Sequence, residues 1–285
     1  MERIEQAYAK VNLFLDVTGK RPDGYHELCS VMQTVTLADT VTVRASLADY
    51  SCVTVEMVDS DIPGDERNLA YLAAEAFLDE SGISASVYVR VEKRIPDCAG
   101  LGGGSADCAA TLRALNKMFN APLSEERLLR LAARLGADVP FCLLGGTRLC
   151  RGIGEVMMPY KMDDLWFVIA MPEDEKVATP AAYRMLDEAF NDYREDDGAF
   201  HEMLFSFFEE EGIDGMYNVF ESVVLPECPS ATSLRTRLIL LGARGAMMSG
   251  SGTAVFGVID SETAARYAAG DIEGAIVAHS APAYT

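Results

Sequence analysis

The residues that most constrain this chain are AGLGGGSADCAATLRALNKMF at 99–119, where four glycines within five residues precede a run of helix formers. We expect a helix that begins near Ser105 and runs to about Asn120. The first N–H groups of a helix have no partner within it and lie at the positive end of its dipole, so they stabilise anions. Glycines let the preceding backbone curve closely around a phosphate. The stretch predicts a phosphate-binding loop, against the simpler alternative of a flexible turn with Ser105 as N-cap.

Two common phosphate loops are excluded by the residues around these glycines. The pattern GxxxxGK[ST] needs a lysine after the last glycine, and none follows. The dinucleotide pattern GxGxxG fails because Ser105 stands where its third glycine belongs. Ser105 and Asp107 lie at the helix start, where hydroxyl and carboxylate oxygens could hold Mg²⁺ against phosphates. For Asp107, a favourable charge in the first helical turn is an equal alternative.

A second constraint is the alternation in YAKVNLFLDV at 8–17. One face is apolar throughout and predicts a strand that covers a core. The residues of that face are Ala9, Val11, Leu13, Leu15 and Val17. The opposite face carries Lys10 and Asn12 two positions apart, so these side chains are expected side by side.

The rest of the chain alternates between strand and helix patterns, which indicates an α+β fold with a sheet on one side and helices on the other. Strands are expected at 31–45, 51–58, 84–95, 165–171 and 253–259, with a strand pair within 147–157. Helices are expected at 68–81, 124–136, 180–191, 199–211, 231–241 and from Ser261. The segment 136–146 reads as a turn, and the glycine cluster MMSGSGTAVFG at 247–257 could by itself be a hairpin turn. A boundary near 159–164 predicts two domains, 1–160 and 161–285.

Composition excludes several classes of protein. A net charge of −20 over 285 residues argues against nucleic-acid binding. No apolar run is long enough to cross a bilayer and the N-terminus lacks a signal-peptide pattern, so a cytoplasmic location is expected. Seven cysteines without a CxxC pair and only three histidines predict neither a disulfide framework nor a zinc site. Cys98, Cys108, Cys142 and Cys150 are expected to fill the core, and the acidic segment 187–211 to be solvated.

Three stretches taken together resemble the GHMP kinase superfamily. They are AKVN in the first strand, PDCAGLGGGS at 96–105, and GARGAMMSGSGTAVFG at 242–257. Within the superfamily, PDGYH at 22–26 and LGADVPFCLLGG at 135–146 are similar to members that phosphorylate a cytidine diphosphate-linked methylerythritol in isoprenoid precursor synthesis. The similarity covers essentially the whole chain and is looser between Lys161 and Ser230.

The resemblance implies a two-domain fold with the active site in the cleft between the halves. The N-terminal half, 1–160, would be an ATP-binding domain like the second domain of ribosomal protein S5, and the C-terminal half, 161–285, would be ferredoxin-like. ATP with Mg²⁺ would be the donor, and the 2-hydroxyl of the acceptor would receive the γ-phosphoryl group. Asp138 matches the catalytic base and Lys10 its electrostatic partner. Without the resemblance, Asp138 reads as a turn aspartate and Lys10 as a surface lysine.

The resemblance also implies two sets of binding residues. Those for the nucleotide are Asn68, Pro96, Ala99, Gly100, Leu101, Gly102, Gly103, Gly104, Ser105 and Asp107. Those for the acceptor are Asn12, Tyr25, His26, Thr179, Pro180, Tyr183 and Gly250. Asn68 is equally explained as a helix N-cap. The chain departs from the family at Ala106, where a second serine is usual, and at Met32, where an aromatic often lines the cytosine pocket.

Two other functions remain open at this point. One is a GHMP kinase for a smaller acceptor such as homoserine or mevalonate, against which PDGYH argues. The other is a non-catalytic ligand sensor of the same fold, which should lack the base or the lysine, whereas this chain keeps both. In either kinase the expected partner is a small-molecule substrate, with no nucleic acid and no membrane, and the chain would act as a monomer or weak homodimer.

Overall fold

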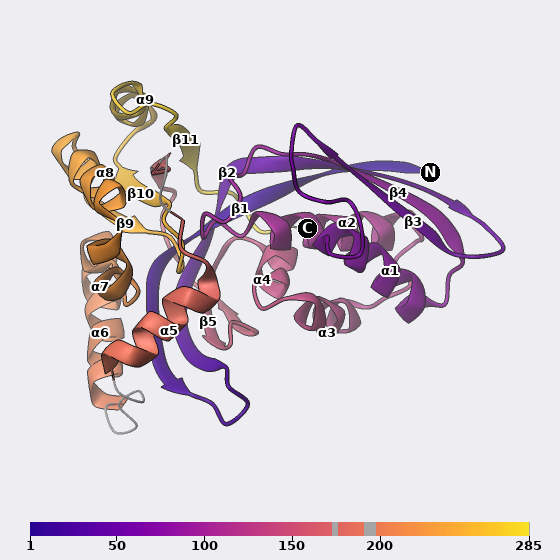
Figure 1. The fold of residues 1–285 in the computed structure, drawn as a ribbon, viewed down its shortest axis with the longest axis horizontal. Helices are drawn as coiled ribbons and strands as arrows, with labels where there is room; N and C mark the ends of the chain where they lie inside the picture. Colours follow the sequence, from indigo (N-terminus) through magenta and orange to yellow (C-terminus); the bar gives the residue numbers. More distant parts are fainter. Residues whose placement is uncertain (173–175, 191–197, 285) are drawn as a thin grey trace.

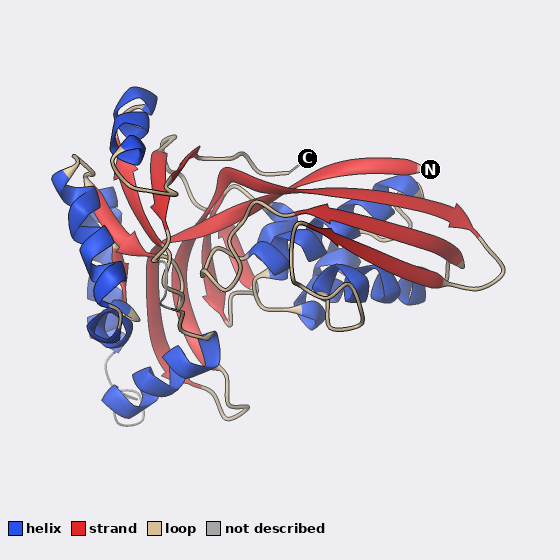
Figure 2. Ribbon diagram, turned by 45° about the horizontal axis from the view of Figure 1, so that its top comes forward, coloured by secondary structure: helices blue, strands red, loops and turns tan. Residues whose placement is uncertain are grey.

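The computed structural model describes residues 1–172, 176–190 and 198–284, and it has the predicted α+β organisation (Figures 1 and 2). The first sheet has the order β3-β4-β2-β1-β8, and β5 pairs with both β2 and β6. Its strands are β1 (Glu2–Lys20), β2 (His26–Leu47), β3 (Cys52–Val58), β4 (Ala85–Glu92), β5 (Thr147–Gly152), β6 (Val156–Pro159) and β8 (Tyr217–Asn218). The second sheet has the order β11-β7-β10-β9. Its strands are β7 (Trp166–Ala170), β9 (Gly245–Met248), β10 (Val255–Ile259) and β11 (Ile276–His279).

Helices of the first half cover one face of the first sheet, and helices near the C-terminus pack against the second sheet. Figure 1 shows the first four helices together below the long strands. They are α1 (Leu69–Ser81), α2 (Gly103–Met118), α3 (Glu125–Leu135) and α4 (Val139–Leu144). The later helices are α5 (Thr179–Phe190), α6 (Gly198–Glu211), α7 (Glu221–Val224), α8 (Pro229–Leu240) and α9 (Glu262–Gly270), with short 3₁₀ turns at Gly212–Gly215 and Leu225–Glu227. No helix among these described residues is both long and apolar enough to span a membrane.

The strand β1 connects the two halves of the molecule. It pairs with β2 along its length, with register shifts on either side of Lys10 and again near Gly19. It also pairs in parallel with β8, where Phe14 lies opposite Tyr217. The ring of Phe14 contacts those of Phe205, Phe208 and Tyr217 at 5.4, 5.5 and 5.8 Å. Both faces of β1 are therefore buried at its centre, because the C-terminal half covers the face that sequence patterning left polar.

The apolar core does not stop at the expected boundary. One buried cluster joins the first sheet and α1–α4 to residues of the second half, among them Phe167, Phe208 and Phe256. A second cluster joins Leu15 and Val17 of β1 to the helices around the second sheet. The division into 1–160 and 161–285 stays a prediction, and extensive packing crosses it.

Three details of the sequence interpretation are wrong. The segment expected as a turn at 136–146 contains α4, because Pro140 is tolerated in a first helical turn and the helix buries its apolar side chains. Helix α2 begins at Gly103 with Gly102 as N-cap, so Ser105 lies inside its first turn and is not the cap. Cys98 is exposed, whereas Cys108, Cys142 and Cys150 are buried as expected.

The acidic segment 187–211 is described only in part. Residues 191–197 lie outside the described residues. The described parts belong to the end of α5 and to α6, both of which confirm predicted helices.

Candidate active site

The glycine loop leads into the N-terminus of α2 with the geometry of an anion cradle. Gly100 and Gly102 have φ of 76° and 73°, in the left-handed region that glycine adopts readily. A Cβ on Gly100 would lie 2.0 Å from the Ser249 carbonyl oxygen, and one on Gly102 would lie 3.0 Å from Cγ of Lys10. No side chain caps the N-terminus of α2 at Gly102. Gly103, Gly104 and Ser105 line a cleft there, as a site for an anion would require.

The second glycine cluster, at 247–257, is hydrogen-bonded to the glycine loop. It connects the antiparallel strands β9 and β10, so the hairpin interpretation is correct. It also packs on the loop, since Ser249 Oγ donates to the Gly100 carbonyl at 3.0 Å and the Ala254 N–H donates to the Ala99 carbonyl at 3.3 Å. Asn218, which sequence patterning did not single out, donates from Nδ2 to the carbonyls of Met248 and Gly250, each at 2.8 Å.

Lys10 and Asp138 lie together beside this cradle. Lys10 Nζ is 3.7 Å from Asp138 Oδ2 and donates to Asn12 Oδ1 at 2.8 Å. The lysine side chain is 5% exposed and the aspartate side chain 34%, so the carboxylate faces the open cleft. The backbone N–H of Lys10 donates to the Leu101 carbonyl at 2.9 Å, which ties β1 to the glycine loop. The predicted neighbours Lys10 and Asn12 are thus side by side, and the lysine is no surface residue.

Aromatic side chains form the opposite part of the cleft. The rings of His26 and Tyr183 are 4.7 Å apart, and Tyr183 meets Phe220 edge-on at 4.8 Å. Tyr25 is 60% exposed, so its ring is accessible to a ligand. At the start of α5, Thr179 Oγ1 accepts a hydrogen bond from Ser251 Oγ at 3.0 Å. The two stretches that were expected to contain acceptor residues are therefore in one place.

A carboxylate that sequence patterning missed joins these stretches. Asp187 of α5 accepts from His26 Nε2 and from Lys20 Nζ, both at 2.7 Å. Burial alone would raise the pKa of Asp187, but these two hydrogen bonds outweigh it, and the pKa lies below its usual range. Asp187 follows Tyr183 by one helical turn, so helical spacing could have indicated it.

The cleft as a whole has a volume of about 810 Å³ and is lined by most of the predicted site residues. These are Lys10, Asn12, Tyr25, His26, Pro96, Ala99, Gly100, Gly102, Gly103, Gly104, Ser105, Asp138, Thr179, Pro180, Tyr183 and Gly250. Met32 lies at its buried side. Three predicted residues are not among its lining, Asn68, Leu101 and Asp107. Asn68 is the N-cap of α1, where Oδ1 accepts from the Ala70 N–H at 2.9 Å and Nδ2 donates to the Pro63 carbonyl at 2.8 Å.

Asp107 belongs to a buried cluster under the loop. Lys93 Nζ donates to Asp107 Oδ2 at 2.8 Å and to Asp39 Oδ2 at 2.5 Å. Asp39 also accepts from the N–H groups of Arg94 and Ile95, at 2.5 and 2.8 Å. Burial raises the pKa of Asp107, against the attraction of Lys93, and its Oδ1 has no partner among the described residues. The cluster braces the chain where it enters the glycine loop.

The protein side chains alone do not make a metal centre here. Within the described ranges, no group of three or more His, Cys, Asp or Glu side chains could hold a metal ion. A magnesium ion would therefore need phosphate oxygens for most of its ligands. The Ser105 hydroxyl lies at the cleft and is suited to reach such an ion, because Mg²⁺ prefers oxygen ligands and keeps few protein contacts.

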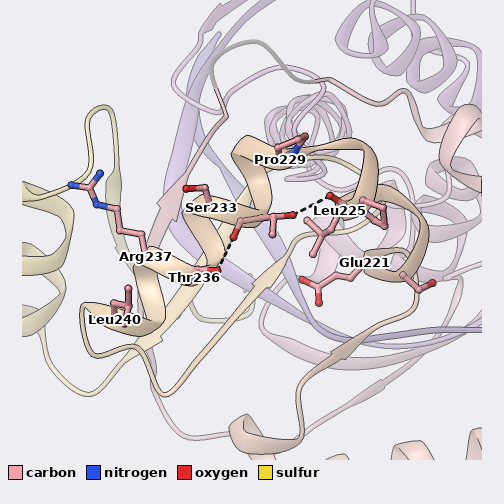
Figure 3. A pocket seen from close by; sticks show the side chains of 10 residues that line it. Glu221, Leu225, Pro229, Ser233, Thr236, Arg237 and Leu240 are labelled. Atoms are coloured by element: carbon pink, nitrogen blue, oxygen red, sulfur yellow. Dashed lines mark hydrogen bonds between the residues drawn. The ribbon is translucent and has the colours of Figure 1, made fainter.

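A second hollow of about 850 Å³ lies between α7 and α8, as Figure 3 shows. Three of its lining hydroxyls donate to nearby carbonyls: Ser222 Oγ to Val219 at 2.7 Å, and Thr232 Oγ1 to Leu225 and Thr236 Oγ1 to Thr232, each at 3.0 Å. Its one carboxylate, Glu221, accepts from the Met248 N–H at 2.8 Å and lies 3.5 Å from Arg235. These bonded groups stabilise the local fold, and the cleft at Lys10 is the stronger candidate for chemistry.

Comparison with known proteins agrees with this geometry. The family profiles "GHMP kinases N terminal domain" and "GHMP kinases C terminal" match residues 68–146 and 185–272. A curated relative from Desulfitobacterium hafniense (strain Y51), named 4-diphosphocytidyl-2-C-methyl-D-erythritol kinase, is 43% identical over 257 residues, 90% of this chain and 87% of the relative. The protein of that name from Gloeobacter violaceus is 40% identical, over 89% of this chain and 84% of its own.

Solved structures show the same fold. A crystal structure of 4-(cytidine 5'-diphospho)-2C-methyl-D-erythritol kinase matches with a TM-score of 0.79 and 35% identity, over 98% of both chains. Homoserine kinase from Cytophaga hutchinsonii matches with a TM-score of 0.72 and 20% identity, over 99% of this chain and 95% of its own. Mevalonate kinase of L. major matches with a TM-score of 0.70 and 15% identity, over 98% of this chain and 96% of its own. The last two likenesses concern the fold alone.

Proposed function

The chain belongs to the GHMP kinase family, and from this premise we propose that it transfers the γ-phosphoryl group of ATP to the 2-hydroxyl of 4-diphosphocytidyl-2-C-methyl-D-erythritol. The products would be the 2-phosphate and ADP, in isoprenoid precursor synthesis. The observation that carries the proposal is the Lys10–Asp138 pair, 3.7 Å apart in a cleft with a glycine cradle on one side and aromatic rings on the other. In this arrangement the glycine cradle suits the phosphates of a donor, Asp138 suits a proton acceptor, and the aromatic rings suit a nucleobase.

The donor would be held mainly by backbone. Successive N–H groups at the start of α2 suit the phosphates of ATP, and side chains at Gly100 or Gly102 would obstruct the loop. Mg²⁺, when bound with ATP, supplies charge neutralisation on the phosphates, and we assign Ser105 as the side chain that reaches it. The burial of Asp107 and its pairing with Lys93 favour a structural role for that carboxylate.

The chemical step needs a proton acceptor and a positive charge. We assign the proton acceptor to Asp138, whose carboxylate would take the proton of the 2-hydroxyl as its oxygen bonds to the γ-phosphorus. The bond from that phosphorus to the oxygen bridging the β- and γ-phosphates breaks in the same step, and ADP leaves. Lys10 would stabilise the negative charge on the transferring group, since its ammonium is buried and fixed by Asn12.

The acceptor would be held mainly by side chains. The exposed ring of Tyr25 and the ring of Tyr183 suit the two faces of a cytosine, and the His26 imidazole suits its polar edge. Asn12 is placed to bind the polyol or the diphosphate. Thr179, Pro180 and Gly250 would complete the walls.

A coupled ADP-release assay with a panel of acceptors tests this function. We expect ADP release with 4-diphosphocytidyl-2-C-methyl-D-erythritol and none above background with 2-C-methyl-D-erythritol 4-phosphate, homoserine or mevalonate. Release with homoserine or mevalonate in place of the cytidyl acceptor would contradict the proposal and identify a kinase for a smaller substrate. Nucleotide binding without release for any acceptor would also contradict it and indicate a ligand sensor.

A further inference from the structure

We propose that Asp187 is a positioning residue of the acceptor pocket: it holds the proton of His26 on Nε2 and so determines what the imidazole presents to a nucleobase. The inference rests on the proposed function, because that proposal assigns the His26 imidazole to the cytosine ring of the acceptor. It assigns a role to a carboxylate at the start of the acidic segment, for which sequence patterning expected only solvation.

The geometry places Asp187 at a junction between two distant segments. His26 is the first residue of β2 and Lys20 is the last residue of β1, so both lie at the turn between these strands. Asp187 comes from α5, which lies beside that end of the two strands in both ribbon views (Figures 1 and 2). One carboxylate oxygen meets His26 Nε2 and the other meets Lys20 Nζ, each at 2.7 Å.

The burial of the pair distinguishes it from an ordinary surface contact. The His26 side chain is 8% exposed and that of Asp187 is 24%, whereas the Lys20 side chain is 40% exposed. Exposed ion pairs contribute little, because water screens the charges and the side chains lose freedom. The histidine contact is the more shielded of the two, so we expect it to carry most of the effect of Asp187.

The chemistry of the contact determines the tautomer. An ionised carboxylate is an acceptor only, so His26 must donate from Nε2. In the neutral ring Nδ1 then presents a lone pair. The 4-amino group of cytosine can donate to a lone pair, whereas uracil has a carbonyl oxygen at that position, which would repel it. Asp187 therefore favours a cytidine acceptor over a uridine acceptor without touching the base.

The contact also fixes the ring in space. The same imidazole packs against the ring of Tyr183, with the two ring planes inclined by 33°, and Tyr183 lies one helical turn before Asp187 on α5. Two residues of one helix thus contact the histidine, Tyr183 through its ring and Asp187 through a hydrogen bond to Nε2. Loss of the hydrogen bond should let the ring turn while Tyr183 remains in place.

The test combines a spectroscopic measurement with kinetics. ¹⁵N-edited NMR of the free protein reports which nitrogen of each of the three histidines carries the proton, and a His26→Gln variant assigns the His26 signals. We expect Nε2–H for His26 in the wild type and a mixture of tautomers in Asp187→Asn. In the kinase assay Asp187→Asn should raise the acceptor KM by about 10- to 100-fold, the size expected for a hydrogen bond to a charged group, with kcat and the KM for ATP nearly unchanged. Its preference for the cytidine over the uridine acceptor should fall.

Two control variants separate the histidine contact from other effects. Glu188→Gln removes the neighbouring exposed carboxylate of the same helix. It should leave the His26 tautomer, kcat, both KM values and the preference for cytidine unchanged. Lys20→Met removes the other ion pair and should raise the acceptor KM by at most about threefold, as for an exposed pair.

Several outcomes would overturn the inference. They are an Nδ1–H tautomer in the wild type, an unchanged acceptor KM or an unchanged cytidine preference in Asp187→Asn, and a Lys20→Met effect as large as that of Asp187→Asn. If Asp187→Asn does not fold, the tautomer of His26 in the wild type and the acceptor KM of Lys20→Met still test the inference. The NMR measurement needs no substrate, so a wild type with Nε2–H on His26 but no ADP release with the cytidyl acceptor would contradict the proposed function and not the contact.

Discussion

The two sides of the cleft are built in different ways. The proposed donor side is a short continuous segment, 96–105, whose shape depends on backbone conformation and on glycines without side chains. The proposed acceptor side combines the β1–β2 turn, α5 and Phe220, which are separated by up to almost two hundred residues and meet through side chains. A backbone site can be recognised in the sequence by its glycines. A side-chain site of this kind depends on how distant segments pack.

The proposed catalytic pair, Lys10 and Asp138, lies where the two sides meet. Lys10 is bound to the glycine loop through its backbone and to Asn12 through its side chain, and Asp138 lies across from it at the N-cap position of α4. The comparison therefore predicts three kinds of active-site variant. The first lowers kcat, the second mainly lowers kcat/KM for ATP, and the third mainly raises the KM for the acceptor.

The largest effect should come from Asp138→Asn, which removes the proposed proton acceptor at the junction of the two sides. We expect kcat to fall by about 10²- to 10⁴-fold, the usual contribution of a positioned acid–base group. Equilibrium binding of ATP and of the acceptor, measured by calorimetry, should remain near the wild-type values. Turnover close to that of the wild type would contradict the assignment of Asp138.

Gly102→Ala should affect the donor side. A left-handed conformation costs a non-glycine residue roughly 1–2 kcal/mol, and the new Cβ would lie 3.0 Å from Cγ of Lys10. We expect kcat/KM for ATP to fall by about 10- to 100-fold, with a smaller change in the acceptor KM. Gly82→Ala is the matched control, because Gly82 has φ of 68° and open space around its Cβ position. If both variants lose ATP efficiency equally, the loop is not the phosphate site.

Tyr183→Ala should affect the acceptor side. The variant loses ring contacts with His26 and Phe220, and aromatic pairs contribute about 0.5–1.5 kcal/mol beyond the area that they bury. The acceptor KM should rise by about tenfold while the KM for ATP stays constant. Tyr183→Phe keeps the ring and should remain close to the wild type. An equal rise in both KM values would mean that the two sides are not separate.

The smallest effect is expected at Asn68. Asn68→Ala removes the N-cap of α1 and should lower the free energy of unfolding by about 1 kcal/mol, as measured by urea denaturation. Both polar atoms of the amide are engaged in the cap and in the Pro63 contact, so the KM for ATP should not change. Asn68→Asp keeps the cap and should be more stable than the alanine variant. A rise in the KM for ATP in both variants would favour the nucleotide contact that the family resemblance implied for Asn68.

Much of the donor side could be predicted from the sequence. The glycine run, the strand with Lys10 and Asn12, and the helices from 68 to 135 have local patterns that tertiary packing did not override. The exceptions have physical reasons. Helix α4 has six residues, too few to show a helical period beside its proline and glycines. The far side of β1 is buried because the second half covers it, and no local pattern reveals such a cover.

Less of the acceptor side could be predicted. Tyr25, His26 and Tyr183 were identified through resemblance, because a tyrosine and a histidine after a turn have no distinctive spacing. Asp187 was missed because its partners lie about 160 residues earlier in the chain. Lys93 and Asn218 were missed for the same reason: each acts by joining segments that are distant in the sequence.

The most direct test of the central claim is a crystal structure with a non-hydrolysable ATP analogue and 4-diphosphocytidyl-2-C-methyl-D-erythritol both bound. The account predicts the β- and γ-phosphates against the N–H groups of Gly102–Ser105, and the acceptor 2-hydroxyl within about 2.6–3.2 Å of Asp138 or one water away. Phosphates bound elsewhere, or an acceptor hydroxyl remote from Asp138, would contradict it.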